Sequence, residues 1–212
     1  ISSYMDADIN YSFDGDWGND DYWGEFAPYD FTSANLRNRR HLSQEFRIAS
    51  QPDRRVFNDS TDWLFGIYYL DMNEDNQVDE FFNGDVYRQL SSQFDSQSTA
   101  VFAQLDSHLT DSNTLTTGLR YERRSADYLD SNGVAASPTD NMWGGQISFN
   151  HKITPQLNSY VTLARGYKAG GFNLSLSVPD ELREYQPEYL WNLETGLKGF
   201  SEDYRWNWNV ST

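Results

Sequence analysis

Apolar and polar residues alternate with a period of two in successive segments of this chain. Near the start, Met5, Ile9 and Phe13 share one parity, while acidic residues and asparagine occupy the other. Because successive side chains of a β-strand point to opposite faces, this alternation predicts strands with one apolar and one polar face. A helical period never persists for ten residues, so we expect an all-β protein. Segments with the same alternation are 4–13, 115–122, 143–150, 191–198 and 205–210.

Further segments read as strands whose facing is harder to predict. The apolar positions of 42–48 and 63–69 follow the same rule. In 101–107, Val101 and Leu105 predict one facing, but Ala100 and Phe102 permit the opposite one. In 157–168 the apolar residues occupy odd positions, but Arg165 occupies an odd position too. The pattern therefore leaves the facing of that segment open.

The connections between these segments alternate in length. Such an alternation is typical of an antiparallel up-and-down transmembrane β-barrel, which has short turns at one edge and long loops at the other. The expected strands of about 10–13 residues are long enough to cross a bilayer at a tilt, whereas soluble sandwiches average about 5–6 residues per strand. Expected long connections are 14–32, 73–95, 127–140 and 170–187, and expected short ones are 51–59, 110–113, 153–156 and 201–203.

Composition narrows the class of protein. The net charge of −16 argues against nucleic-acid binding, which needs clustered Lys and Arg. The mean hydropathy of −0.76 would suit a disordered chain, but 16% of the residues are aromatic, which disordered chains are not. On a barrel, Trp and Tyr would form the girdles at the two membrane interfaces. The absence of cysteine excludes disulfides and thiolate sites, no Gly-x-Ser-x-Gly elbow occurs, and we expect no enzyme.

Several strings resemble the barrel of TonB-dependent outer-membrane receptors, and their order and spacing extend the resemblance over nearly the whole chain. The most specific are Arg-Gly-Tyr-Lys-Ala-Gly-Gly-Phe-Asn at 165–173 and Glu-Thr-Gly-Leu-Lys-Gly at 194–199. We expect the glycines of the first string to relieve crowding or turn the chain. The supporting strings are Gln-Glu-Phe-Arg-Ile-Ala-Ser at 44–50, Trp-Leu-Phe-Gly-Ile-Tyr-Tyr at 63–69 and Thr-Gly-Leu-Arg-Tyr-Glu at 117–122.

The resemblance implies a barrel of about 22 strands closed by a separate plug domain. It implies a place in the outer membrane of a Gram-negative bacterium, among lipid and lipopolysaccharide, and uptake of a scarce ligand energised by the TonB complex. Such ligands are ferric siderophores, haem, cobalamin or glycans, and we favour an iron chelate. The chain shows about nine strands, no plug and no aromatic last residue, so we expect residues 1–212 to be part of a barrel. Alternatives are a passive porin-like barrel and, less favoured, a soluble β-rich carbohydrate-binding module.

Two acid-rich stretches, 14–30 and 71–95, are expected on the outer side. Asp14, Asp16 and their neighbours resemble an oxygen cluster for calcium, but the regular ligand spacing is absent. We favour solvated loops, because a charge run is usually a solvated face. The aromatic residues among these acids could hold a sugar or an aromatic chelate by stacking, and the candidates are Trp17, Tyr22 and Trp23.

A second candidate site is the row of basic residues that occupies alternate positions from Arg37 onward. Arg37, Arg39 and His41 would project into the lumen, where they could attract a carboxylate-rich ferric chelate. We favour a structural charge ladder over this site, with pairing to Asp6 and Asp8 on the preceding strand. The three histidines of the chain are too scattered for a metal site. The sequence thus offers ligand-binding candidates but no catalytic residue, resident metal or cofactor.

Overall fold

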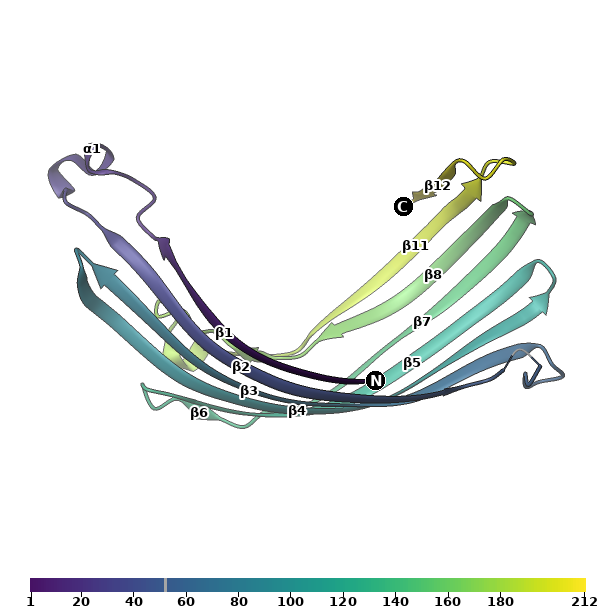
Figure 1. Ribbon diagram of the computed structural model, residues 1–212, viewed down its shortest axis with the longest axis horizontal. Helices are drawn as coiled ribbons and strands as arrows, with labels where there is room; N and C mark the ends of the chain where they lie inside the picture. The colour runs from purple at the N-terminus through teal and green to yellow at the C-terminus, as the bar shows by residue number, and fades with distance from the viewer. Residues whose placement is uncertain (52) are drawn as a thin grey trace.

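The computed structural model describes residues 1–51 and 53–212 and shows one large antiparallel sheet. Its strands follow the order β1-β2-β3-β4-β5-β7-β8-β11-β12, so each main strand pairs with its neighbours along the chain (Figure 1). The sheet curves strongly and stays open between β1 and β12. The all-β, up-and-down antiparallel prediction with about nine strands is confirmed. The strands are β1 (Ser2–Asp14), β2 (Phe31–Ala49), β3 (Thr61–Phe82), β4 (Asp85–Thr110), β5 (Asn113–Asp130), β6 (Ala135–Ala136), β7 (Thr139–Thr154), β8 (Leu157–Lys168), β9 (Gly171–Phe172), β10 (Glu184–Tyr185), β11 (Glu188–Phe200) and β12 (Asn207–Ser211).

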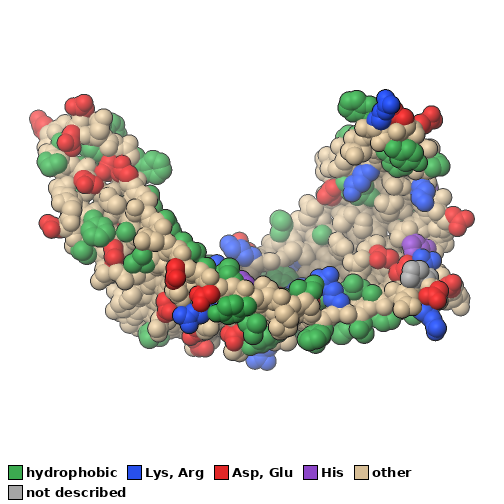
Figure 2. All heavy atoms as spheres, in the orientation of Figure 1, with side chains coloured by type: hydrophobic (Ala, Val, Ile, Leu, Met, Phe, Trp, Pro, Cys, Tyr) green, Lys and Arg blue, Asp and Glu red, His purple; other side chains and the backbone are tan. Residues whose placement is uncertain are grey.

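Helical structure is confined to short turns. They are α1 (Asp20–Trp23), η1 (Gly24–Phe26) and η2 (Asp180–Leu182), all at the end of the sheet where the longer connections lie. In the described part of the chain, no helix is both long and apolar enough to cross a bilayer. The end that carries α1 shows acidic but no basic side chains in Figure 2.

One face of the sheet carries a continuous apolar band, which we call the outer face. The register places Phe65 opposite Ala103, and Ile67 opposite Val101. Phe65 and Ile67 are 44% and 45% exposed, which suits contact with lipid. The predicted facings of 42–48 and 63–69 are therefore confirmed, and 101–107, whose facing the sequence left open, places Val101 and Leu105 on the outer face. Hydrophobic side chains are visible along the convex side in Figure 2.

The facing of 157–168, which the sequence left open, is settled by its neighbours. Arg165 of β8 pairs with Gly145 of β7 and with Trp191 of β11, and so it lies on the outer face beside Leu163. An arginine therefore stands at the edge of the apolar band, towards the end with the longer connections.

The strands β3 and β4 have 22 and 26 residues and extend well beyond the apolar band. The prediction of a long loop over 73–95 is wrong, because these residues continue both strands to a tight turn at Asn83 and Gly84, where φ is 48° and 84°. Within the loop predicted over 127–140, residues 127–130, 135–136 and 139–140 are likewise strand, in β5, β6 and β7. Polar residues occupy both faces here, as expected where the strands of a barrel extend past a bilayer into water, and the hydrophobic alternation disappears.

The strand β1 faces the opposite way from the barrel prediction. On a barrel the apolar face of each strand would contact lipid, but Ala7 pairs with Arg39 and Ile9 with Arg37, on the face opposite the apolar band. We call this second face the inner face, because the segment 170–185 folds against it. The reason for the inversion is local: beyond the apolar band the apolar side chains of β1 line the interior, while its acids face water.

Candidate ligand-binding site

The segment between β8 and β11 folds back against the inner face of β4 and β5. The ring of Phe172 stacks on that of Tyr128, with centroids 4.1 Å apart and planes 6° apart, and Phe94 packs at 6.1 Å. Arg88 of β4 donates a hydrogen bond of 3.2 Å from Nη1 to the carbonyl oxygen of Leu176. The segment is thus packed on the wall by both aromatic and polar contacts.

A buried arginine anchors the same segment. Arg183 is 2% exposed, and its Nε lies 2.9 Å from Oδ1 of Asp180 and 3.6 Å from Oδ2 of Asp130. Asp130, at the end of β5, also accepts a 3.0 Å hydrogen bond from the Tyr128 hydroxyl. Burial and this bond to a carboxylate raise the pKa of Tyr128 to about 12, so its hydroxyl stays a donor at neutral pH. Buried charges need such partners, because an unpaired one is costly.

Two glycines allow the segment to double back on itself. A Cβ atom on Gly170 would lie 2.6 Å from the backbone oxygen of Tyr185, and one on Gly171 would lie 2.6 Å from its hydroxyl. Gly166 has nothing within 4 Å of such an atom. The expectation that these glycines relieve crowding is confirmed for Gly170 and Gly171.

A cavity of about 650 Å³ lies between this segment and the inner faces of β1 to β5. Three arginines line it, with two carboxylates and several aromatic rings. Arg37 and Arg39 come from β2, Arg124 comes from β5, and the carboxylates are Glu74 and Glu80 of β3. The rings are those of Tyr11, Phe13, Phe94, Tyr128, Phe172 and Tyr185.

The arginines of the cavity are held in place by neutral and acidic partners. Arg37 Nε donates a 2.7 Å hydrogen bond to Asn76 and lies 3.4 Å from Glu74, and Arg39 is paired with the same Glu74. Arg124 is hydrogen-bonded to the carbonyl oxygen of Gly170. A guanidinium presents five N–H donors in a rigid fork, so these contacts leave donors for a ligand. Together with the rings, such donors can bind an anionic ligand that also has flat apolar parts.

The structure revises the partners that the sequence suggested for this face. The expected ladder between Arg37 or Arg39 and the acids of β1 is wrong, because Asp6 and Asp8 lie on the outer face. Asp6 lies 3.7 Å from Arg40 there. Arg37 and Arg39 instead pair towards β3. His41 shares their face but does not line the cavity.

The aromatic candidates of the 14–30 loop lie apart from the cavity. Trp17 and Tyr22 are 89% and 76% exposed, and Trp23 packs on Tyr29 at 4.3 Å. Arg37 is six residues from Phe31, the end of β2 nearest this loop, which is about 20 Å along a strand. None of Trp17, Tyr22 and Trp23 lines the cavity.

The acids of that loop stabilise its backbone. Asp16 accepts 3.0 Å hydrogen bonds from the amides of Phe31 and Gly18, and these bonds hold the pKa of its carboxyl below the ordinary value. Within the described residues, no three acidic or histidine side chains are grouped as metal ligands would be. The resemblance to a calcium cluster therefore does not extend to geometry.

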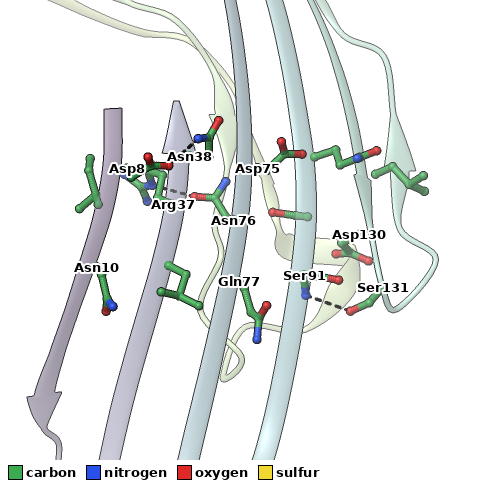
Figure 3. A pocket seen from close by; sticks show the side chains of 15 residues that line it. Asp8, Asn10, Arg37, Asn38, Asp75, Asn76, Gln77, Ser91, Asp130 and Ser131 are labelled. Atoms are coloured by element: carbon green, nitrogen blue, oxygen red, sulfur yellow. Dashed lines mark hydrogen bonds between the residues drawn. The ribbon is translucent and has the colours of Figure 1, made fainter. Parts of the chain in front are cut away.

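A second cavity, of about 750 Å³, lies where β1 to β5 extend beyond the apolar band (Figure 3). Asp8, Asn38 and Asp75 share its outward side by register. These groups are already hydrogen-bonded in part, since Asn38 donates a 2.6 Å bond to Asp8. Because this side faces away from the lumen, we assign no ligand site to it.

Sequence reasoning missed four residues of the inner site: Arg124, Tyr128, Phe172 and Arg183. Arg124 and Tyr128 lie in the part of β5 whose alternation is masked by polar residues on both faces. The sequence did contain signals for the other two residues. Phe172 belongs to the glycine-containing string at 165–173, and Arg183 is the one basic residue among the acids of 180–188.

Comparison with known proteins identifies a family for this chain. The family model described as TonB dependent receptor-like, beta-barrel matches residues 2–212. Pesticin receptors of Yersinia enterocolitica and Yersinia pestis are 26% identical over 164 residues, which cover 73% of this chain and 24% of each receptor. The chain thus spans about a quarter of the length of these curated relatives.

Solved structures show the same curved sheet. The ferric yersiniabactin uptake receptor of Yersinia pestis superposes with a TM-score of 0.69 at 22% identity, covering 82% of this chain and 29% of that receptor. The ferric preacinetobactin receptor of Acinetobacter baumannii gives 0.61 at 12% identity, covering 99% of this chain and 33% of that receptor. At these identities the likeness establishes the fold.

Proposed function

The chain belongs to the β-barrel family of the TonB-dependent receptors, and we propose that it is a section of an outer-membrane receptor that takes up an iron chelate. In this proposal, residues 1–212 form about nine strands of the barrel wall, and a plug domain outside this section connects the receptor to the TonB complex. The receptor is a transporter without a catalytic residue. Its ligand is a small molecule that arrives from the outer side.

The single observation that supports this function is the cavity on the inner face. It combines three arginines with aromatic rings, at the end of the barrel where the longer connections lie. A siderophore complex with carboxylate, phenolate or catecholate groups has the matching features, which are negative charge and flat rings. Names of related proteins agree, since one structural relative is a ferric yersiniabactin uptake receptor.

We propose that Arg37 and Arg39 bind the anionic groups of the chelate, together with Arg124. Tyr11 and Phe13, which line the cavity and are exposed, supply the rings on which its flat parts pack. The earlier candidates Trp17, Tyr22, Trp23 and His41 do not line this cavity.

The test uses the complete receptor in cells that lack other ferric receptors. Replacing Arg37 and Arg39 by glutamine together should weaken binding of an anionic ferric siderophore at least about tenfold, because hydrogen bonds to charged groups contribute about 1.5–3 kcal/mol each. Binding to whole cells and uptake of radioactive iron are measured separately. Cells without TonB should bind the chelate but not accumulate it.

The chain offers a matched control in the same strand. Arg40 directly follows Arg39 in sequence but lies on the outer face, paired with Asp6. The variant Arg40→Gln should bind and transport as the parent does. Equal loss in this control would refute the inner cavity as the site, and accumulation that is independent of TonB would favour the passive porin-like barrel.

A further inference from the structure

Two arginines of the inner cavity share a single carboxylate. Arg37 Nε lies 3.4 Å from Oε1 of Glu74, and Arg39 is paired with Oε2 of the same residue. The side chain of Glu74 is 10% exposed, whereas those of Arg37 and Arg39 are 30% and 33% exposed, so the arginines are the more accessible partners. This trio of Arg37, Arg39 and Glu74 keeps one positive charge that its carboxylate does not neutralise.

The other charged side chains at the cavity add no positive charge. Arg124 Nη1 lies 3.5 Å from Oδ2 of Asp140, and Glu80 Oε2 lies 2.6 Å from Nη2 of Arg88, so each of these pairs is neutral. Arg183 has two acidic partners, is 2% exposed and does not line the cavity. The cavity with its paired neighbours therefore presents a single excess positive charge to a ligand.

The approach to the cavity from the outer side is acidic. The stretch 14–30 contains acidic residues but no Lys or Arg, and the end of the sheet that carries it shows no basic side chain in Figure 2. This stretch begins directly after Phe13, which lines the cavity. An acidic surface repels an approaching anion in proportion to the charge of that anion. Chelates with several negative charges are therefore disfavoured before they reach the cavity.

Aromatic contact can supply affinity that does not depend on charge. Tyr11 and Phe13 line the cavity from β1 and are 46% and 50% exposed, so their rings are open to a ligand. Packing of flat apolar groups against such rings is favourable whatever the net charge of the chelate. The rings thus select the shape of the ligand, and the trio selects its charge.

We propose that the inner cavity binds a ferric chelate with flat rings and one net negative charge, and that Glu74 sets this limit on charge. The inference rests on the proposed function and narrows its ligand. One negative charge is matched by the excess positive charge of the trio. This chelate differs from the carboxylate-rich one that the sequence suggested for Arg37 and Arg39.

The limit on charge follows from the cost of each additional negative group. A second or third charge would enter the cavity without a partner and close to the carboxylate of Glu74. An unpaired charge that loses its water is costly, and the repulsion from Glu74 adds to that cost. Selectivity of this kind comes from a repulsive group as well as from attractive ones.

The experiment compares two ferric probes of different charge. The first is the complex of a hexadentate ethylenediamine with two phenolate and two carboxylate arms, whose four negative donors leave one net negative charge on the iron(III) complex. The second is a hexadentate tris-catecholate complex, whose six negative oxygens leave three. Dissociation constants are measured by equilibrium dialysis of radioactive iron with the purified complete receptor in detergent, at one ionic strength because salt screens charge. The parent should bind the monoanionic probe at least about tenfold more tightly.

Glu74→Gln tests the role of this residue directly. Glutamine keeps the length of the side chain and an oxygen that can accept from Arg37 and Arg39, so the variant removes the charge and leaves the acceptor. It should reduce the preference for the monoanionic probe about tenfold or more, because the lost repulsion acts on three charges in one probe and on one in the other. Glu80→Gln leaves the trio intact and should shift the preference in the same direction, so it decides the question if Glu74→Gln does not fold.

The control is Glu188→Gln, which removes the same charge from an exposed position at the start of β11, outside the cavity lining. It should show the preference of the parent. The inference is overturned if the parent binds the trianionic probe as tightly as the monoanionic one, if Glu74→Gln keeps the preference of the parent, or if Glu188→Gln loses as much of it. Equal weakening of both probes in Glu74→Gln also overturns it, because Glu74 would then only position the arginines.

Accumulation of iron in cells keeps this result apart from the uptake proposal. If the monoanionic probe binds more tightly but does not accumulate with TonB, the charge preference holds and the proposed function fails. If a chelate accumulates with TonB but the preference is absent, the proposed function holds and the inference is overturned. Binding of neither probe to the purified receptor overturns the inference as well.

Discussion

At the scale of single residues, Arg183 shows how a charge shapes the candidate site. It is buried with Asp130, whose side chain is fully covered, and it connects η2 to the end of β5. Asp130 also accepts hydrogen bonds from Tyr128 and from the amides of Asn132 and Val134, so it would keep some partners without Arg183. The position of the segment 170–185 therefore depends on this pair but not on it alone.

Replacing Arg183 by methionine should loosen the segment while preserving most of the packing volume. Loss of one partner of a buried pair costs about 3–5 kcal/mol, and the remaining donors to Asp130 should reduce this to about 2–3 kcal/mol. Hydrogen exchange of residues 170–187 in the complete receptor should become faster. Arg205→Met, in an exposed ion pair, should leave exchange in this segment unchanged. Protection equal to that of the parent in Arg183→Met would show that aromatic packing alone holds the segment.

At the scale of strands, glycines decide where the backbones of the wall come close. A Cβ atom on Gly145 of β7 would lie 2.6 Å from the backbone oxygen of Gly118 on β5, whereas Gly166 of β8 has open space around that position. Two glycines of similar appearance in the sequence thus have different roles in the sheet.

The pair gives a matched prediction for stability. Gly145→Ala should destabilise the barrel by about 1–3 kcal/mol, because strand backbones must separate to admit the methyl group. Gly166→Ala should be neutral or slightly stabilising, since alanine loses less conformational entropy in a strand. The urea midpoint of the complete receptor in lipid vesicles, followed by its heat-modifiable mobility on gels, measures both. Equal midpoints for the two variants would contradict the close approach of β5 and β7.

The same elements show what the sequence could and could not predict. Where lipid contacts one face, as at Phe65 and Ile67, the alternation predicts both the strand and its facing. Beyond the band, water replaces lipid, and polar residues such as Asp75 and Asn76 occupy both faces, so strand residues were predicted as loop. The inner cavity was not predicted for a related reason. Some of its residues come from these same strand extensions, and others come from the segment 170–185, which lies about 45 residues after Arg124 and reaches it only on folding.

At the scale of the whole molecule, the curved sheet has two features that are unfavourable in water: an exposed apolar face and unpaired strand edges. Its outer face is apolar across most strands, and among the described residues β1 and β12 each present an edge without a partner strand. Unpaired edges are not tolerated in the hydrocarbon region of a membrane, where backbone groups have no water to bond. Both features are explained if this sheet closes with further strands into a complete barrel.

This argument predicts the behaviour of the 212-residue chain made on its own. Without strands to pair with β1 and β12, and with side chains such as Trp191 and Leu193 exposed at 59% and 68%, it should aggregate in detergent-free buffer. Light scattering after size-exclusion chromatography measures the state of the chain. The complete receptor in detergent is the control and should elute as a folded species. A monomeric, folded chain in plain buffer would mean that its apolar faces are buried against each other, which is incompatible with a barrel wall.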